Sequence, residues 1–480
     1  MVDKTYLELS EDDGVAHKFY EVSVDGCELT VRYGRIGTQG QTKTSRLANV
    51  EKARAEAQKK LAEKRRKGYA PAVIGQRKKR PVTHRPVESQ RSNASTGAPI
   101  LWQFKTRRPA FGIFVDPRGC WMGNQSGEVY QLSLTGETLA KFQLPEGVKC
   151  LVADDMWLYC GCDDGKVYDL SGKLPFVAYE IDDDVNILWL DIRDGLLGIG
   201  DTDGYLTLVN HDDESQWRRR ASGRMGWMVR CDELGIYYGD SDGVTMFDWE
   251  DGTVLWQQPT RGSVLFGWQE ESAVYAATAL RCIQRFAKRG VPGAIYECDA
   301  PVYACATAED GRYLFAGDNS SSVYCFAEDG RRLWKLATPC GSALSMQYFD
   351  EKLYFVTTSG QLACMDVAEG ALTRARRGEL PQARQIQQPA ALQATAPVTA
   401  GALETAASNA PMPRGVVVEC REEAGQLRIY PVSAGYRPHW RVQFPKNLRQ
   451  PKARYWVAEL REARQGGFYR ALGDIKRLAD

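Results

Sequence analysis

The segment GDTDGYLTLV, residues 200–209, has six near copies along the chain, and their regular spacing predicts the fold. Successive copies begin 38 to 40 residues apart, and each joins an apolar run to an alternating strand through a small polar turn. The other copies are GNQSGEVYQL (123–132), GCDDGKVYDL (161–170), GDSDGVTMF (239–247), ATALRCIQRF (277–286), GDNSSSVYCF (317–326) and VTTSGQLACM (356–365). A repeat of about 39 residues with four short strands is one propeller blade, so the sequence predicts a mainly β chain with a seven-bladed β-propeller at residues 98–376.

The two ends of the repeat array predict how the ring closes. The last copy runs into DVAEGALTRARR, which is a poor strand, whereas ILWQF (100–104) stands before the first copy and resembles the fourth strands LWQQ and LWKL. We therefore expect residues 100–104 to complete the last blade and to remove its open strand edge. The copy ATALRCIQRF lacks the turn glycine, so we expect its second turn to be irregular.

Charge divides the chain into three parts, although the net charge is only +1. Residues 1–91 carry 20 Lys and Arg against 12 Asp and Glu, residues 92–370 carry 24 against 40, and residues 411–480 carry 14 against 7. Basic segments suit polyanions and acidic segments repel them, so we expect any nucleic-acid contacts near the two ends. The alternative is that these charges form only solvated faces.

Residues 1–70 have the pattern of a small α/β module. The segment HKFYEVSVDGCELTVRYGRIG (17–37) alternates and turns at an Asp-Gly pair, which predicts a β-hairpin. The residues that follow predict a strand and then an amphipathic helix, with Asn49 as the N-cap and Gly68 as the C-cap. The apolar side of this helix carries Ala53, Ala57 and Leu61.

This module resembles a WGR domain, which is found in DNA-damage-responsive poly(ADP-ribose) polymerases and in bacterial proteins of the molybdate-regulator type. The resemblance covers nearly all of residues 3–70 and includes an Arg-x-Gly-Arg-x-Gly-x-x-Gly core that begins at Arg32. Tyr33 stands where the family name places a tryptophan. In the polymerases the matching aromatic side chain packs on the sugar at a DNA 5′ end and the domain grips backbone phosphates, so the resemblance implies these roles for Tyr33, Arg32 and Arg35.

Physical chemistry is consistent with this assignment. An aromatic ring can stack on a terminal base or sugar for about 1–3 kcal/mol, arginine contacts phosphate with two hydrogen bonds, and glycines let the backbone approach a ligand closely. The candidate residues for binding DNA or RNA are Arg32, Tyr33, Gly34, Arg35, Gly37, Lys43, Lys59 and Lys60. The alternative is that Tyr33 and Arg35 pack within the module and that binding has been lost.

Two linkers and a tail complete the organisation. Residues 71–97 predict a basic, flexible linker, and residues 377–412, rich in Ala, Gln and Pro, predict a disordered one. Residues 413–480 predict a small α/β domain with a hairpin, a strand and a helix, and they resemble the tails of bacterial WGR-propeller proteins. The aromatic residues Trp440, Phe444, Tyr455 and Trp456 are expected in its core, although with their basic neighbours they could form a second nucleic-acid surface.

Enzymatic activity, a metal and a cofactor are not expected. DWEDGTVLW and FAEDGRRLW resemble the tryptophan-docking repeats of quinoprotein dehydrogenases, which use pyrroloquinoline quinone and calcium, but those enzymes are generally secreted and eight-bladed. The Asp-Gly turns lack the carboxylate spacing of an EF-hand. The 13 Cys and 4 His show no metal-ligand spacing, so we expect reduced, buried cysteines. An acidic N-terminus and the lack of a long apolar run predict a cytoplasmic chain without membrane contact.

Two functions remain open from the sequence. The first is a nucleic-acid-binding adaptor, in which the WGR-like module binds DNA ends or backbone and the acidic propeller recruits protein partners. The second is a protein-interaction scaffold in a bacterial defence or conflict complex, without direct nucleic-acid binding.

Overall fold

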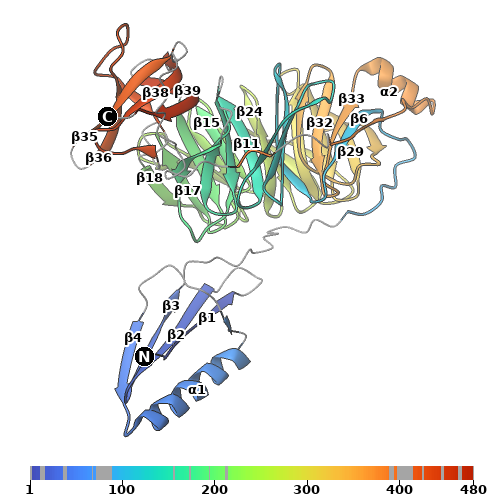
Figure 1. Cartoon of the computed structure of the whole chain (residues 1–480). Helices are drawn as coiled ribbons and strands as arrows, with labels where there is room; N and C mark the ends of the chain where they lie inside the picture. Colours follow the sequence, from blue (N-terminus) through green and yellow to red (C-terminus); the bar gives the residue numbers. More distant parts are fainter. Residues whose placement is uncertain are drawn as a thin grey trace. The chain divides into compact units, whose positions relative to one another are not determined.

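The chain folds into two compact units, Met1–Pro81 and Val82–Asp480 (Figure 1). The computed structural model describes residues 3–10, 17–35, 41–67, 69–71, 89–154, 157–171, 175–193, 195–210, 215–388, 394–396, 415–423, 426–444, 448–462 and 468–478. Two helices and 39 strands lie in these ranges, so the chain is mainly β as predicted.

The first unit is a five-stranded sheet covered by one helix (Figure 1). Its elements are β1 (Asp3–Ser10), β2 (His17–Asp25), β3 (Glu28–Arg35), β4 (Gln41–Arg46), α1 (Val50–Arg66) and β5 (Ala70–Pro71), and the sheet order is β4-β3-β2-β1-β5. The Asn49 side chain accepts a hydrogen bond from the backbone N–H of Lys52, which confirms the predicted N-cap. The predicted C-cap, Gly68, lies outside the described residues. Ala53, Ala57 and Leu61 are buried against the sheet, as the helical spacing predicted.

The second unit contains seven consecutive antiparallel sheets that form the predicted ring of blades. The inner strands contact one another in order around the ring, and the seventh contacts the first. The blades are β7 (Ala110–Asp116), β8 (Gly119–Asn124), β9 (Glu128–Leu132) and β10 (Thr138–Gln143); β11 (Val148–Asp154), β12 (Trp157–Cys162), β13 (Lys166–Asp169) and β14 (Phe176–Glu180); β15 (Ile187–Arg193), β16 (Leu196–Asp201), β17 (Tyr205–Val209) and β18 (Ser215–Arg220); β19 (Met228–Cys231), β20 (Ile236–Gly239), β21 (Gly243–Phe247) and β22 (Val254–Pro259); β23 (Val264–Gln269), β24 (Ala273–Thr278), β25 (Cys282–Ala287) and β26 (Pro292–Glu297); β27 (Val302–Ala308), β28 (Tyr313–Asp318), β29 (Ser322–Ala327) and β30 (Arg332–Ala337); and β31 (Ala343–Phe349), β32 (Lys352–Thr357), β33 (Gln361–Asp366) and β6 (Ile100–Lys105).

The ring closes through β6, as the sequence predicted. This strand pairs antiparallel with β33, from Lys105 opposite Gln361 to Ile100 opposite Met365. The Trp102 and Phe104 side chains, two residues apart and therefore on one face of the closing strand, are buried in a cluster with residues of the first and last blades. A strand that precedes the first blade therefore completes the last one.

In six of the seven repeats the turn is held by the side chain at its second position, and the second copy has Cys162 there instead. Asp201 accepts hydrogen bonds from the backbone N–H groups of Asp203 and Tyr205, both at 2.9 Å, and Gly204 takes a φ of +85°.

Two copies lack this glycine, and Arg281 and Ser321 take its place with φ of +62° and +51°. The turn at Arg281 is regular, because β24 and β25 pair in register on both sides of it. The second turn of this copy, for which irregularity was expected, joins β25 to β26, whose register shifts between Gln284 and Phe286. Arg281 is held in a conformation that costs about 1–2 kcal/mol for a residue other than glycine.

Side chains from several blades meet at the ring axis. Phe111 of the first blade and Trp227 beside the fourth stack with ring centroids 6.1 Å apart. Lys149 is fully buried with its ammonium 4.4 Å from the Phe111 ring centroid, and it forms an ion pair with Asp163 at 3.1 Å. This end of the axis is therefore packed with side chains.

The residues after the last blade differ from the disordered linker predicted at 377–412. The helix α2 (Glu369–Arg376) follows the last strand, and β34 (Arg384–Ile386) then pairs in parallel with β6. Thr395 further forms a bridge with Phe142 of β10. Low apolar content suggested disorder, but the free edge of the closing strand supplies hydrogen-bond partners that the sequence of this segment does not reveal.

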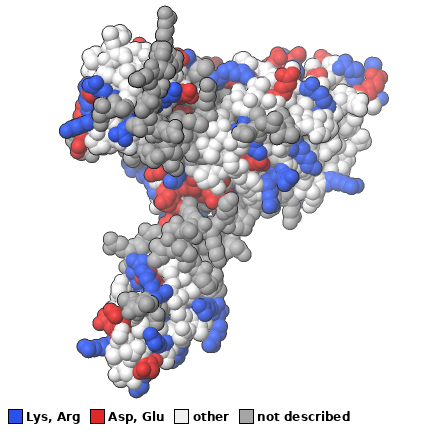
Figure 2. Space-filling view, in the orientation of Figure 1, with Lys and Arg blue, Asp and Glu red and all other residues white. Residues whose placement is uncertain are grey.

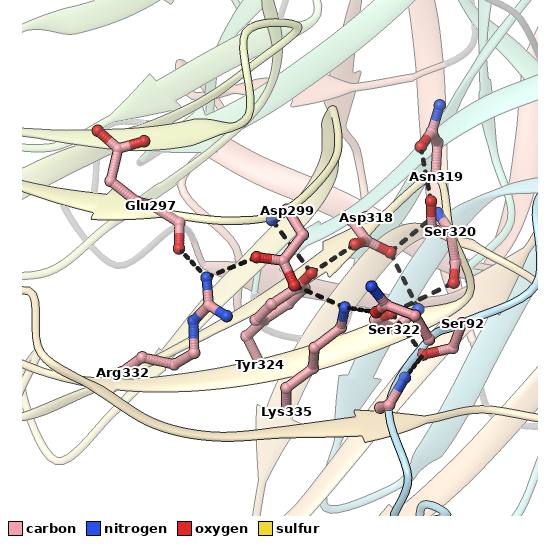
Figure 3. A network of polar contacts seen from close by, with 12 residues as sticks. Ser92, Glu297, Asp299, Asp318, Asn319, Ser320, Ser322, Tyr324, Arg332 and Lys335 are labelled. Carbon is pink, nitrogen blue, oxygen red and sulfur yellow. Dashed lines mark hydrogen bonds and ion pairs between the residues drawn. The ribbon is translucent and has the colours of Figure 1, made fainter.

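The end of the predicted basic linker, residues 89–97, lies against the sixth and seventh blades. Ser89 hydrogen bonds to Ser321 and Ser342, and Ser92 to Ser322. Lys335 binds Asn93 and also Asp299, at 2.7 Å for the latter. Figure 3 shows this network, in which Asp299 further pairs with Arg332 and Tyr324 donates to Asp318. These residues are therefore part of the propeller surface.

The tail forms a five-stranded sheet instead of the predicted α/β domain, and its described residues contain no helix. Its order is β36-β35-β38-β39-β37, with β35 (Val416–Glu423), β36 (Gln426–Pro431), β37 (Arg441–Gln443), β38 (Arg454–Glu462) and β39 (Phe468–Arg477). The segment predicted as a helix is β38, because pairing with strands on both sides outweighs its helical propensity. Phe444 and Tyr455 are buried in this sheet's core and Trp440 packs half-buried against it, as expected, whereas Trp456 is buried on the other face of β38.

The tail sheet is attached to the second blade through a buried amide. Gln443 Nε2 donates to the hydroxyls of Tyr159 and Tyr179, at 3.0 and 2.8 Å. All three side chains are buried. The tail and the propeller therefore share an ordered polar contact.

Candidate nucleic-acid interface

The alternation of β3 places the two central candidate residues on opposite faces of the first unit's sheet. Tyr33 pairs with Tyr20 and Val31 with Val22, on the face that α1 covers. Arg32 pairs with Glu21 on the other face. Because neighbouring residues of a strand point to opposite sides, one flat ligand cannot contact the Tyr33 ring and the Arg32 guanidinium on the same face.

Tyr33 is the exposed end of a row of three tyrosines. Its side chain is 41% exposed, whereas Tyr20 and Tyr69 are buried. The ring centroids of Tyr33 and Tyr20 are 6.3 Å apart with the planes at 30°, and Tyr69 meets Tyr20 edge-on at 6.3 Å. The buried rings fix the position of the exposed one, which keeps a free area for stacking.

A lysine of α1 adds a positive charge to this row. The ammonium of Lys64 lies 4.6 Å from the Tyr20 centroid and 5.2 Å from that of Tyr69. Burial raises the pKa of the Tyr20 hydroxyl, so this ring stays neutral at physiological pH. Lys64 therefore lies in the last turn of the helix, over the Tyr20 and Tyr69 rings.

Arg32 is engaged within the unit. Its Nη2 lies 3.5 Å from Glu21 Oε2, and its guanidinium lies 5.1 Å from the Phe19 centroid. Lys4 contacts the same carboxylate oxygen at 3.0 Å. Glu21 is largely buried, so its charge is balanced by two cations on the open face of the sheet. Arg32 is thus held within the module, whereas the packing alternative from the sequence named Tyr33 and Arg35.

The remaining candidates lie in three places. Gly34 lies in β3 opposite Phe19, and Lys43 lies in the exposed edge strand β4 opposite Val31, hence on the Tyr33 side. Lys59 is exposed on α1, and Lys60 pairs with Glu56 at 3.5 Å. Arg35 ends β3, whereas Gly37 lies outside the described residues.

Sequence reasoning missed Tyr20, Lys64 and Tyr69. The pairing of Tyr20 with Tyr33 follows from the hairpin register around Asp25 and Gly26, so the sequence did contain that signal. The approach of Lys64 depends on how the helix lies on the sheet, which its charge pattern does not determine. Figure 2 shows basic side chains on several sides of the first unit, interrupted by acidic ones.

The described residues offer no metal centre, since no group of three or more His, Cys, Asp or Glu side chains is placed to hold an ion. All thirteen cysteines are free, and twelve of them are buried. Among the helices that the structure describes, none is long and apolar enough to cross a membrane.

Comparison with known proteins identifies two parts of the chain. Residues 3–76 match the family model described as WGR domain, and residues 202–429 match the model described as outer membrane protein assembly factor BamB. The WD40 β-propeller domain of Doa1 superposes with a TM-score of 0.51 at 14% identity, over 57% of this chain and 98% of that one.

The computationally designed Ika8 protein superposes with a TM-score of 0.47 at 12% identity, over 56% of this chain and all of that one. The search of curated proteins gave no match. The likeness to Doa1 shows a shared propeller fold.

Proposed function

Because residues 3–76 are a WGR domain joined to a β-propeller, we propose that this chain is a nucleic-acid-binding adaptor. The WGR domain binds DNA or RNA at ends or along the backbone, without sequence preference. The propeller recruits protein partners. The proposal assigns no catalytic activity and no cofactor to the chain.

The observation that carries this proposal is the exposed Tyr33 ring, supported by Tyr20, whose ring the Lys64 ammonium also contacts. The end of a DNA or RNA strand exposes the flat face of its terminal nucleotide, which the Tyr33 ring can cover. Lys64, on the same face of the sheet, attracts the phosphate. The contribution of stacking is about 1–3 kcal/mol and does not depend on base identity.

The two faces of the sheet predict a division of roles among the basic residues. Lys43 and Lys64 lie on the Tyr33 side and contact phosphates there, whereas Arg32 is balanced by Glu21 on the other side. Each phosphate that a cation neutralises releases counterions, so affinity falls linearly with the logarithm of salt concentration.

The test is fluorescence anisotropy with a short labelled duplex and a closed circular competitor over a salt series. Tyr33→Ala is expected to weaken binding to duplex ends by about 1–3 kcal/mol and to leave binding to the circle nearly unchanged. Tyr33→Phe keeps the ring and serves as the matched control. Charge reversal of Lys59 and Lys60 is expected to weaken binding to both substrates and to flatten the salt slope.

Two outcomes contradict the proposal. Equal losses on duplex and circle by a folded Tyr33→Ala variant remove end recognition and leave only a basic surface. No salt-dependent binding by the full chain removes nucleic acid altogether, and the scaffold function is then the remaining one.

A further inference from the structure

The outermost strand of the fourth blade, β22, closely resembles the strand that closes the ring. Its sequence begins VLWQ, and β6 begins ILWQ. In both strands the register shifts beside the tryptophan. Each indole N–H donates to a backbone carbonyl of the next blade, Trp102 to Leu134 at 3.2 Å and Trp256 to Lys288 at 2.8 Å.

The outer edge of β6 is occupied by β34. Arg384, Gln385 and Ile386 pair in parallel with Trp102, Gln103 and Phe104. Ile386 and the Trp102 ring both lie against Gly136, where an added Cβ would come within 3.1 Å of each. A left-handed glycine in the turn of the next blade thus leaves room for an aliphatic side chain beside the tryptophan.

The same arrangement exists at β22 without an added strand in the described residues. Gly290 takes the place of Gly136, with a φ of +82° against +90°, and its Cβ position lies 2.8 Å from the Trp256 ring. Around this site Val254 is 55%, Leu255 49% and Val291 62% exposed. An aliphatic side chain would cover these apolar groups.

β22 also lacks the charged side chains that other outermost strands carry, and its one edge-protecting residue, Pro259, stands at its last position. The strand contains no charged residue, whereas charged side chains block strand addition at free edges. Its counterparts in other blades carry charges: Glu180 in β14, Arg218, Arg219 and Arg220 in β18, Glu297 in β26, and Arg332 and Lys335 in β30. The uncharged edge is therefore available for pairing.

We propose that an extended segment of a partner protein adds to β22 as a parallel fifth strand, as β34 adds to β6. It carries an aliphatic residue at the position of Ile386. Basic residues precede this residue, because the exposed Glu250 and Asp251 stand just before β22 and a parallel strand passes them first. The inference rests on the adaptor function, for which it names the surface and the kind of partner.

The probe is a labelled peptide PQARQIQQ, residues 381–388 of this chain, titrated into the full chain. We expect saturable binding that the peptide with Pro381→Lys strengthens and the peptide with Ile386→Asp abolishes. The double variant Val254→Lys, Leu255→Lys is expected to weaken binding at least tenfold. Leu280→Lys, another exposed leucine but in a turn, is the matched control and should bind as the unaltered chain does.

Three outcomes overturn the proposal. The first is binding of the peptide no stronger than that of a scrambled peptide. The second is equal peptide affinity of the double variant and the Leu280→Lys control when both have the same melting temperature. The third is self-association of the unaltered chain that the double variant abolishes. The last result would assign the edge to a second copy of the chain. Since the assay contains no nucleic acid, its failure leaves the DNA titration unaffected.

Discussion

Replacing Trp102 by alanine tests whether β6 holds the ring closed. The side chain is buried, its indole N–H donates to Leu134 of the first blade, and its ring lies 6.1 Å from Tyr354 of the last. Removal of a buried tryptophan costs about 3–5 kcal/mol. For a domain of this size we expect the melting temperature to fall by roughly 6–20 °C.

Trp256→Ala is the matched control, because this tryptophan makes the same hydrogen bond to the next blade but is only half-buried. Its replacement should cost only about 1–2 kcal/mol, because about half of the apolar area of the Trp256 side chain is buried in the first place. Guanidinium unfolding followed by circular dichroism measures both variants.

Truncation gives an independent measurement of the same contact. Removing residues 1–88 should leave the transition of the propeller unchanged, whereas removing residues 1–105 should lower it sharply, because β33 then loses its partner. Equal effects of the two truncations, or a Trp256→Ala loss as large as that of Trp102→Ala, would refute the assignment of β6 as the closing strand.

Four further predictions concern single residues. Arg281→Gly should raise the melting temperature relative to Arg281→Ala, because only glycine relieves the positive φ. Burial raises the pKa of Asp169 to about 6, so the folded state binds a proton more readily than the unfolded state does. The free energy of unfolding should therefore fall as pH rises from about 4 to 7, and Asp169→Asn should flatten this dependence in thermal melts. Glu21→Gln should leave the salt dependence of DNA binding unchanged, because Arg32 lies on the sheet face opposite Tyr33, and a steeper slope would show that phosphates reach that face. Gln443→Leu removes the two hydrogen bonds that join the tail sheet to the second blade, at a cost of about 1–3 kcal/mol, and limited proteolysis should then release the tail sheet.

Periodicity was sufficient to predict the blades and the closing strand, because each repeat encodes its own turn and alternation. Periodicity was insufficient where tertiary contacts determine the backbone conformation or the secondary structure. Arg281 accepts the conformation of a glycine because paired strands hold it, and β34 exists because a free edge is close by. The helix predicted in the tail is a strand for the same reason.

The candidate site was predictable only as a group of residues. Tyr33 is exposed as its assigned role requires, and strand alternation, already present in the sequence, separates it from Arg32. The position of Lys64 depends on how α1 packs on the sheet. Charge and motif therefore identified the domain, whereas only the structure shows that Tyr33 and Lys64 lie on the same face of the sheet.

Closure by β6 sets an order of events during synthesis on the ribosome. The strand emerges before all seven blades, but its partner residues begin only at Gln361. At about 5–20 residues per second, β6 waits roughly 10–50 s with an apolar edge unpaired. The WGR domain lies upstream and can fold during this interval, so the nascent chain gains its binding module before its ring. A ribosome that stalls between these points would release a product with a complete WGR domain and an open, aggregation-prone propeller.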